Sequence, residues 1–175
     1  MNRSKTYKLV WSGLLIALGV VLPFLTGQIQ SIGNMLLPMH LPVLIGGFIC
    51  GGPYGAAIGF IVPLLRSMMF GMPPMFPVAV SMACELAVYG FVTGFLYRRL
   101  PKKNSMIYVA LIAAMIAGRI VAGAANVVLY GIGGNGYSMQ MFMAGMFLNA
   151  IPGIILQLVL IPVLIMIFKK SKVME

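Results

Sequence analysis

Long apolar stretches alternate along the chain with short segments rich in glycine, proline or lysine, and this pattern predicts a bundle of membrane-spanning helices. A helix needs roughly 20 apolar residues to cross the hydrocarbon core of a bilayer. The stretches near that length cover residues 8–25, 35–51, 54–70, 77–97, 105–130 and 139–168. We therefore expect an all-α integral membrane protein, with residues 1–175 forming a single membrane domain of six transmembrane helices.

The second of these stretches is the least regular. Its continuous apolar part, from Leu41 to Gly51, is too short to cross about 30 Å at 1.5 Å per residue. A longer helix that begins near Asn34 must accommodate Pro38 and Pro42. We therefore expect residues 26–40 to fold partly into the protein from the outer face, where protein or a watery cavity satisfies their backbone polar groups.

Composition and charge support the membrane assignment and orient the helices. Hydrophobic residues make up 61% of the chain and charged residues only 8%, although the net charge is +10. Ten of the twelve basic residues lie in three patches: Arg3, Lys5 and Lys8; Arg98, Arg99, Lys102 and Lys103; Lys169, Lys170 and Lys172. With six crossings, all three patches fall on one side, which the positive-inside rule makes cytoplasmic together with both termini. The basic charge therefore indicates a lipid bilayer and no nucleic acid.

Three ionisable residues lie within the apolar stretches, and each needs a partner or a function. Such a residue costs about 2.5 to 3.5 kcal/mol on insertion scales. Glu85 and Arg119 lie at similar depths, counted from the outer ends of their predicted helices. We therefore expect these two to form an ion pair. Arg66, near the outer end of its helix, either snorkels to the interface or binds a ligand.

Further polar residues recur at helical spacing on the last two predicted helices. Arg119, Asn126 and Tyr130 are separated by seven and four residues, and Asn149 and Gln157 by eight. We expect the two stripes to face inward and form a polar binding cavity, although interhelical hydrogen bonds with a structural ion pair are the alternative for any one residue. His40, the single histidine, lies beside the outer mouth of this cavity, either as an interfacial residue or as a ligand contact.

Some chemistries find little support in the sequence. There is no GxxxxGK[ST] phosphate loop for ATP hydrolysis, and no paired nucleophile and base for an intramembrane protease. Sixteen methionines suggest a soft-metal channel, but methionine also fills apolar cores. We expect no enzymatic activity, no cofactor and no metal site.

Three segments resemble the substrate-binding S component of energy-coupling factor (ECF) vitamin transporters: "WSGLLIALGVVLP", "LPMHLPVLIGG" and "MPPMFPVAVSMACELA". The resemblance implies a six-helix protein that binds one vitamin near the outer face. It also implies partners, namely a transmembrane scaffold protein and two ATPase subunits that supply the energy. Gly13 and Ala17 match the family's small-residue pattern at the scaffold interface, with glycine in place of the first alanine; the alternative is helix contact within the monomer.

The function expected from sequence is therefore capture of a small water-soluble vitamin or precursor at a bacterial cell membrane. Two intramembrane arginines against one glutamate favour a carboxylate-bearing ligand. Pantothenate is the first candidate, and pyridoxine-, hydroxymethylpyrimidine- or queuosine-precursor-like ligands are the others. The alternative is a stand-alone proton-coupled secondary transporter or a channel, in which Glu85 carries the proton. The expected substrate-binding residues are His40, Arg66, Glu85, Arg119, Asn126, Tyr130 and Asn149.

Overall fold

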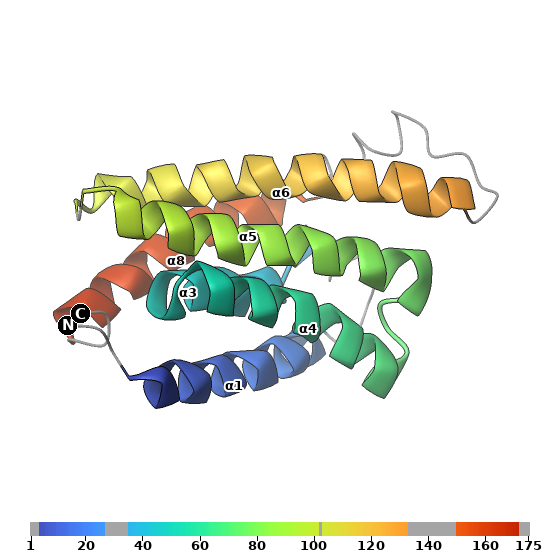
Figure 1. Cartoon of the computed structure of the whole chain (residues 1–175), viewed down its shortest axis with the longest axis horizontal. Coiled ribbons are helices and arrows are strands. Elements are labelled where there is room, and N and C mark those ends of the chain that lie inside the picture. The colour runs from blue at the N-terminus through green and yellow to red at the C-terminus, as the bar shows by residue number, and fades with distance from the viewer. Residues whose placement is uncertain (1–3, 27–34, 102, 133–149, 172–175) are drawn as a thin grey trace.

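A computed structural model describes residues 4–26, 35–101, 103–132 and 150–171, and every regular element in these ranges is helical (Figure 1). The elements in chain order are α1 (Lys5–Val21), η1 (Leu22–Thr26), α3 (His40–Cys50), α4 (Gly52–Phe70), η2 (Met75–Ala79), α5 (Val80–Arg99), α6 (Ser105–Ile132) and α8 (Ile151–Lys170). Five segments are long and apolar enough to cross a membrane: Lys5–Leu25, Gly52–Phe70, Met75–Arg99, Ser105–Ile132 and Ile151–Lys170. The chain is thus a multi-pass membrane protein.

The second expected helix is shorter than the range of residues 35–51. Its regular part, α3, has 11 residues and begins at His40. Leu37 precedes Pro38 and has a φ of 51°, and the residue before a proline is disfavoured in helical conformation. Pro42 falls within the first turn of α3, where a missing N–H leaves no hydrogen bond unmade. The two prolines therefore allow a short helix and stop a longer one.

The helices run side by side along the long axis of the molecule (Figure 1). The start of α1, the end of α8 and the connection from α5 to α6 lie at the same end of this bundle (Figure 1). Basic residues gather at this end, because α5 finishes with Arg98 and Arg99 and α8 with Lys169 and Lys170. The common end agrees with the charge pattern, and its assignment to the cytoplasm stays a prediction.

Glycines bring α3, α4 and α5 into close contact at the centre of the bundle. A Cβ atom placed on Gly90 of α5 would collide with the carbonyl of Gly55 on α4, and one on Gly47 of α3 would lie 2.6 Å from the Gly90 carbonyl oxygen. Side chains at these positions would push the backbones apart. The glycines therefore fix how three helices sit against one another, and with them the side chains that the helices carry inward.

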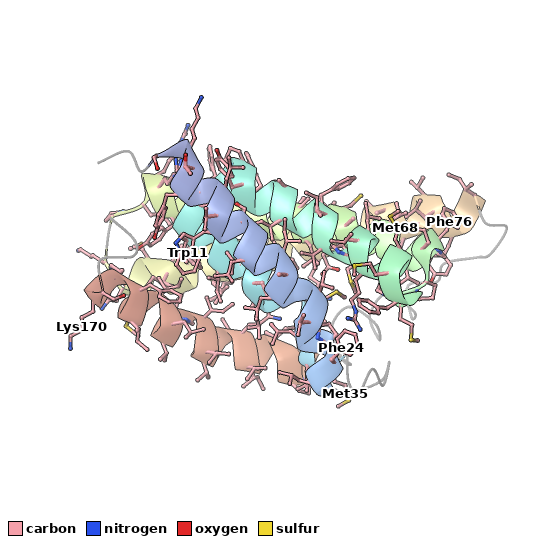
Figure 2. The ribbon with its side chains drawn as sticks, turned by 90° about the horizontal axis from the view of Figure 1, so that it is seen from below. Trp11, Phe24, Met35, Met68, Phe76 and Lys170 are labelled. Atoms are coloured by element: carbon pink, nitrogen blue, oxygen red, sulfur yellow. The ribbon has the colours of Figure 1, made fainter. Side chains whose placement is uncertain are left out.

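Apolar side chains cover both the inside and the outside of the bundle. Leu44, Ile58, Leu86, Leu111 and Ile161 are fully buried at its core. Many large hydrophobic side chains also point outward from the bundle. Figure 2 shows the side chains along α1, which carries the label Trp11, and along α8, which ends at Lys170. An apolar outer surface of this kind suits a protein that lipid surrounds.

Candidate functional site

Glu85 lies inside the bundle and has a cationic partner. Its side chain projects inward from α5 and the residue is 4% exposed. Nη1 of Arg119, which is buried on α6, lies 3.3 Å from Oε1 of Glu85. The expected pair of Glu85 and Arg119 is therefore confirmed. In a low-dielectric interior, each residue offsets part of the cost of burying the other.

His40 joins this pair from a third helix. It is the first residue of α3, it is 1% exposed, and its Nε2 lies 3.7 Å from Oε1 of Glu85. The imidazole of His40 thus lies within the protein, and its role as a ligand contact stays a prediction. The reason for its burial is the late start of α3, which places the histidine at an inner helix terminus and away from the surface. We call His40, Glu85 and Arg119 the buried triad.

Tyr89 was missed by the sequence reasoning. Its ring is 1% exposed and meets the imidazole of His40 edge to face, with ring centroids 5.2 Å apart. Tyr89 follows Glu85 by four residues, and residues at this spacing share one helix face. The spacing from Glu85 was the signal in the sequence that could have found it.

A close approach of α5 and α6 brings the triad together. A Cβ atom on Gly118, the neighbour of Arg119, would lie 3.2 Å from the carbonyl oxygen of Glu85 and 3.3 Å from the ring of Tyr89. The small residue allows α6 to come near enough for Arg119 to reach the carboxylate. The ion pair therefore depends on Gly118, although glycine has no side chain that could take part in it.

Two residues of the expected α6 stripe are also placed by the structure. Asn126 is buried on α6, whereas Tyr130, one turn further towards the end of that helix, is half-buried. Both face inward, at least in part, as the stripe predicted. Asn149 lies outside the described residues.

Gln157 is placed on the inner face of α8. It is 1% exposed, and its amide Nε2 has no hydrogen-bond partner among the described residues. Gly153, one turn earlier on the same face, contacts the chain just before α3, since its Cβ would lie 2.6 Å from the carbonyl oxygen of Met35. Gln157 therefore faces the interior next to the segment that leads to His40.

The contacts of Arg66 are with residues outside the buried triad. It is 3% exposed, and its Nη1 donates a 2.6 Å hydrogen bond to the carbonyl oxygen of Val20 on α1. Its guanidinium also lies over the rings of Phe24 and Phe70. The protein encloses this side chain, and the choice between snorkelling and ligand binding for Arg66 stays a prediction.

Gly13 and Ala17 lie on the outer face of α1. Both are exposed, and a Cβ atom on Gly13 would meet nothing within 4 Å. Ser12, Leu15, Gly19 and Val20 form the opposite, buried face of the helix. The alternative that Gly13 packs within the monomer is therefore wrong, and the two small residues are available to a partner helix.

The chemistry of the buried triad is that of ionic and hydrogen-bonding recognition. The described residues contain no group of three or more His, Cys, Asp or Glu side chains placed to hold a metal ion. The triad instead offers a carboxylate, a guanidinium and an imidazole, whose two ring nitrogens have no hydrogen-bond partner in the described part of the chain. Such an arrangement can bind a small polar molecule or hold a proton.

A family model for the substrate-specific component of ECF transporters matches residues 7–165. The chain belongs to this family. The match covers nearly the whole sequence, from the first turn of α1 to the last part of α8, so the resemblance found in three segments extends to the complete helical domain. No curated protein and no solved structure matches the chain. The substrate-specific components are transport subunits.

Proposed function

We propose that this S component captures a small water-soluble vitamin or vitamin precursor from outside a bacterial cell and delivers it to an ATP-driven importer. The observation that carries the proposal is the buried triad, in which α3, α5 and α6 each contribute one ionisable side chain to a single place. In a transport subunit of this family, a convergence of charged groups inside an apolar bundle is the best candidate for the ligand site.

Two features favour a binding role over a purely structural ion pair. Glu85 and Arg119 would satisfy one another without a histidine, yet His40 is buried beside them at the cost of desolvating its ring. His40 and Gln157 both retain buried nitrogen atoms without hydrogen-bond partners in the described ranges. A polar ligand would supply such partners. We therefore propose His40, Glu85, Arg119, Asn126 and Gln157 as ligand contacts, with Tyr130 one turn beyond Asn126 on α6. Asn149, which lies outside the described residues, stays a predicted contact.

The charge around the triad refines the choice of ligand. Arg119 faces Glu85, so the pair is neutral, and the second arginine, Arg66, contacts the end of α1. A ligand carboxylate near Glu85 would therefore rely on a protonated His40 for attraction. Pantothenate stays the first candidate. Pyridoxine- and hydroxymethylpyrimidine-like ligands and a queuosine precursor are the other candidates, since they can bind by hydrogen bonds alone.

Ligand binding is tested by purifying the chain in detergent from rich medium and identifying the co-purifying small molecule by mass spectrometry. Thermal stabilisation by pantothenate is then compared with that by pantothenol, its neutral alcohol analogue, and by pyridoxine. We expect wild type to retain a compound that His40→Ala loses. Thr93→Val is the matched control, since Thr93 is buried on the same helix as Glu85. Retention of the same compound by both variants would remove His40 from the site.

The energy for uptake is proposed to come from partners. The described helices present an exposed pair of small residues, Gly13 and Ala17, which suits close approach of a scaffold helix. The proposed assembly therefore contains the S component, the ECF transmembrane scaffold protein and two ATPase subunits, with α1 as the docking helix.

A second candidate function is proton-coupled transport by the chain alone. The 3.7 Å distance between His40 and Glu85 favours it, because two buried titratable groups this close affect each other's protonation. Uptake into vesicles separates the two functions. Uptake that needs the ATPase subunits and ATP supports the S component, and uptake driven by a pH gradient without them supports the alternative.

A further inference from the structure

Arg66 is a buried cation without a carboxylate partner among the described residues. The chain contains only two acidic residues. One of them, Glu85, already faces His40 and Arg119, and the other, Glu175, is the last residue of the sequence. A charge enclosed in an apolar bundle needs a specific function to offset its desolvation, and the contacts of Arg66 show what that function is.

The hydrogen bond of Arg66 falls where α1 stops being a regular helix. The guanidinium donates to the carbonyl oxygen of Val20, one residue before α1 ends at Val21 and the 3₁₀ turn η1 begins. In a 3₁₀ pattern that carbonyl would accept from the N–H of residue 23. Residue 23 is proline, which has no N–H. An unsatisfied carbonyl is costly inside a membrane protein.

We infer that Arg66 is a positioning residue: its guanidinium supplies the hydrogen bond that Pro23 withholds and so ties the outer end of α1 to α4. Two aromatic rings also contact the Arg66 guanidinium at this connection between α1 and α4. The Cζ atom of Arg66 lies 5.1 Å from the ring centroid of Phe24 and 5.5 Å from that of Phe70. These rings meet edge to face at 5.0 Å. The π faces stabilise the cation where water is scarce.

A second tie holds the other end of α1. The thiol of Cys50, at the end of α3, donates to the carbonyl oxygen of Lys8 at 3.7 Å. Gly13 and Ala17 lie between Lys8 and Val20, the two points at which α1 is hydrogen-bonded to neighbouring helices. Arg66 thereby sets the direction in which the exposed small residues point. This consequence rests on the proposed docking role of α1, whereas the link between Arg66 and Pro23 does not.

A double-mutant cycle tests whether Arg66 and Pro23 are energetically coupled. Arg66→Met keeps the length of the side chain and removes its donors, and Pro23→Ala restores an N–H that can reach the Val20 carbonyl. We expect Arg66→Met to destabilise the chain and so to raise its equilibrium constant for unfolding by on the order of tenfold, as for loss of a hydrogen bond to a charged group. The same substitution in a Pro23→Ala background should cost clearly less. Both are measured by SDS unfolding of the purified chain.

Binding to the scaffold protein distinguishes a residue that positions α1 from one that only stabilises the fold. In pull-downs of the purified chains with the scaffold protein, Arg66→Met should lose binding and Pro23→Ala/Arg66→Met should recover it. If Arg66→Met cannot be purified, Arg66→Lys replaces it in the same cycle, with a smaller loss expected because an ammonium group donates without the planar fork.

Independent, additive effects of the two substitutions on unfolding would overturn the inference. Normal scaffold binding by Arg66→Met, where Gly13→Leu abolishes it, would show that Arg66 does not position the exposed face of α1. Failure of the docking role has a different result. If scaffold binding is insensitive to the outer face of α1 as a whole, the unfolding cycle still shows coupling between positions 23 and 66, while every variant assembles.

Discussion

At the scale of single residues, the structure gives Glu85 two basic neighbours of different kinds. Arg119 is permanently charged, whereas His40 can gain or lose a proton. Removal of either member of the ion pair leaves the other buried, which costs roughly 3 to 5 kcal/mol in buried pairs. The histidine makes the two removals unequal, because His40 can take up a proton to face a Glu85 that has lost Arg119.

The prediction at this scale follows from that asymmetry. Glu85→Gln should destabilise the chain more than Arg119→Gln, and the double substitution should recover part of the loss, because no lone charge remains. SDS unfolding of the four proteins measures these changes. Strictly additive losses would show that the two residues are not energetically coupled. If the double variant is stable yet binds no ligand, the pair also serves the site.

At the scale of elements, α1 has a face packed against the bundle and an exposed face that we propose for docking. Gly19 meets the core, where an added Cβ would lie 2.9 Å from Cγ1 of Val62, whereas Gly13 faces open space. The two glycines are six residues apart on one helix, so they form a matched pair of positions with opposite surroundings. Bulk added at one should disturb folding, and bulk added at the other should disturb assembly.

We therefore predict that Gly13→Leu and Ala17→Leu abolish scaffold binding and uptake. The free energy of unfolding of the isolated chain should stay within about 0.5 kcal/mol of wild type, as for surface substitutions. Gly19→Leu should instead destabilise the isolated chain by about 1 to 3 kcal/mol through overpacking. Co-purification and SDS unfolding provide the two readouts. Normal assembly of both Gly13→Leu and Ala17→Leu would exclude this face as the docking surface.

At the scale of the whole molecule, one end of the bundle is basic and the other is not. Lys8, Arg98, Lys103 and Lys169 all lie at or beside helix ends that Figure 1 shows together. Positively charged segments favour the cytoplasmic side. The outer end of α6, at Ile132, should then face the outside of the cell.

Cysteine labelling in intact cells tests this orientation. Cys50 and Cys84 are both free and are first replaced, with serine at position 50 to keep a donor for the Lys8 carbonyl. A cysteine at Ile132, which is exposed at the end of α6, should react with a membrane-impermeant reagent. A cysteine at Lys103 should react only after the cells are opened. Labelling of position 103 from outside would reverse the assigned topology.

The membrane character, the common end of the basic patches and the pairing of Glu85 with Arg119 could all be predicted from the amino-acid sequence. Each follows from a local rule: apolar length, charge near helix ends, and the cost of an unpaired charge in lipid. The family likewise followed from linear motifs that run through most of the chain. None of these conclusions requires knowledge of which helices are neighbours.

The positions of His40, Tyr89 and Arg66 could not be predicted from the sequence, because they depend on the packing of the helices. His40 is buried because Leu37 and Pro38 delay the start of α3, and it meets Tyr89 because α3 and α5 approach through Gly47 and Gly90. The partner of Arg66 is a backbone carbonyl, which no side-chain pattern marks. These contacts depend on which helices touch and at what register, and small residues that carry no polar signal set both.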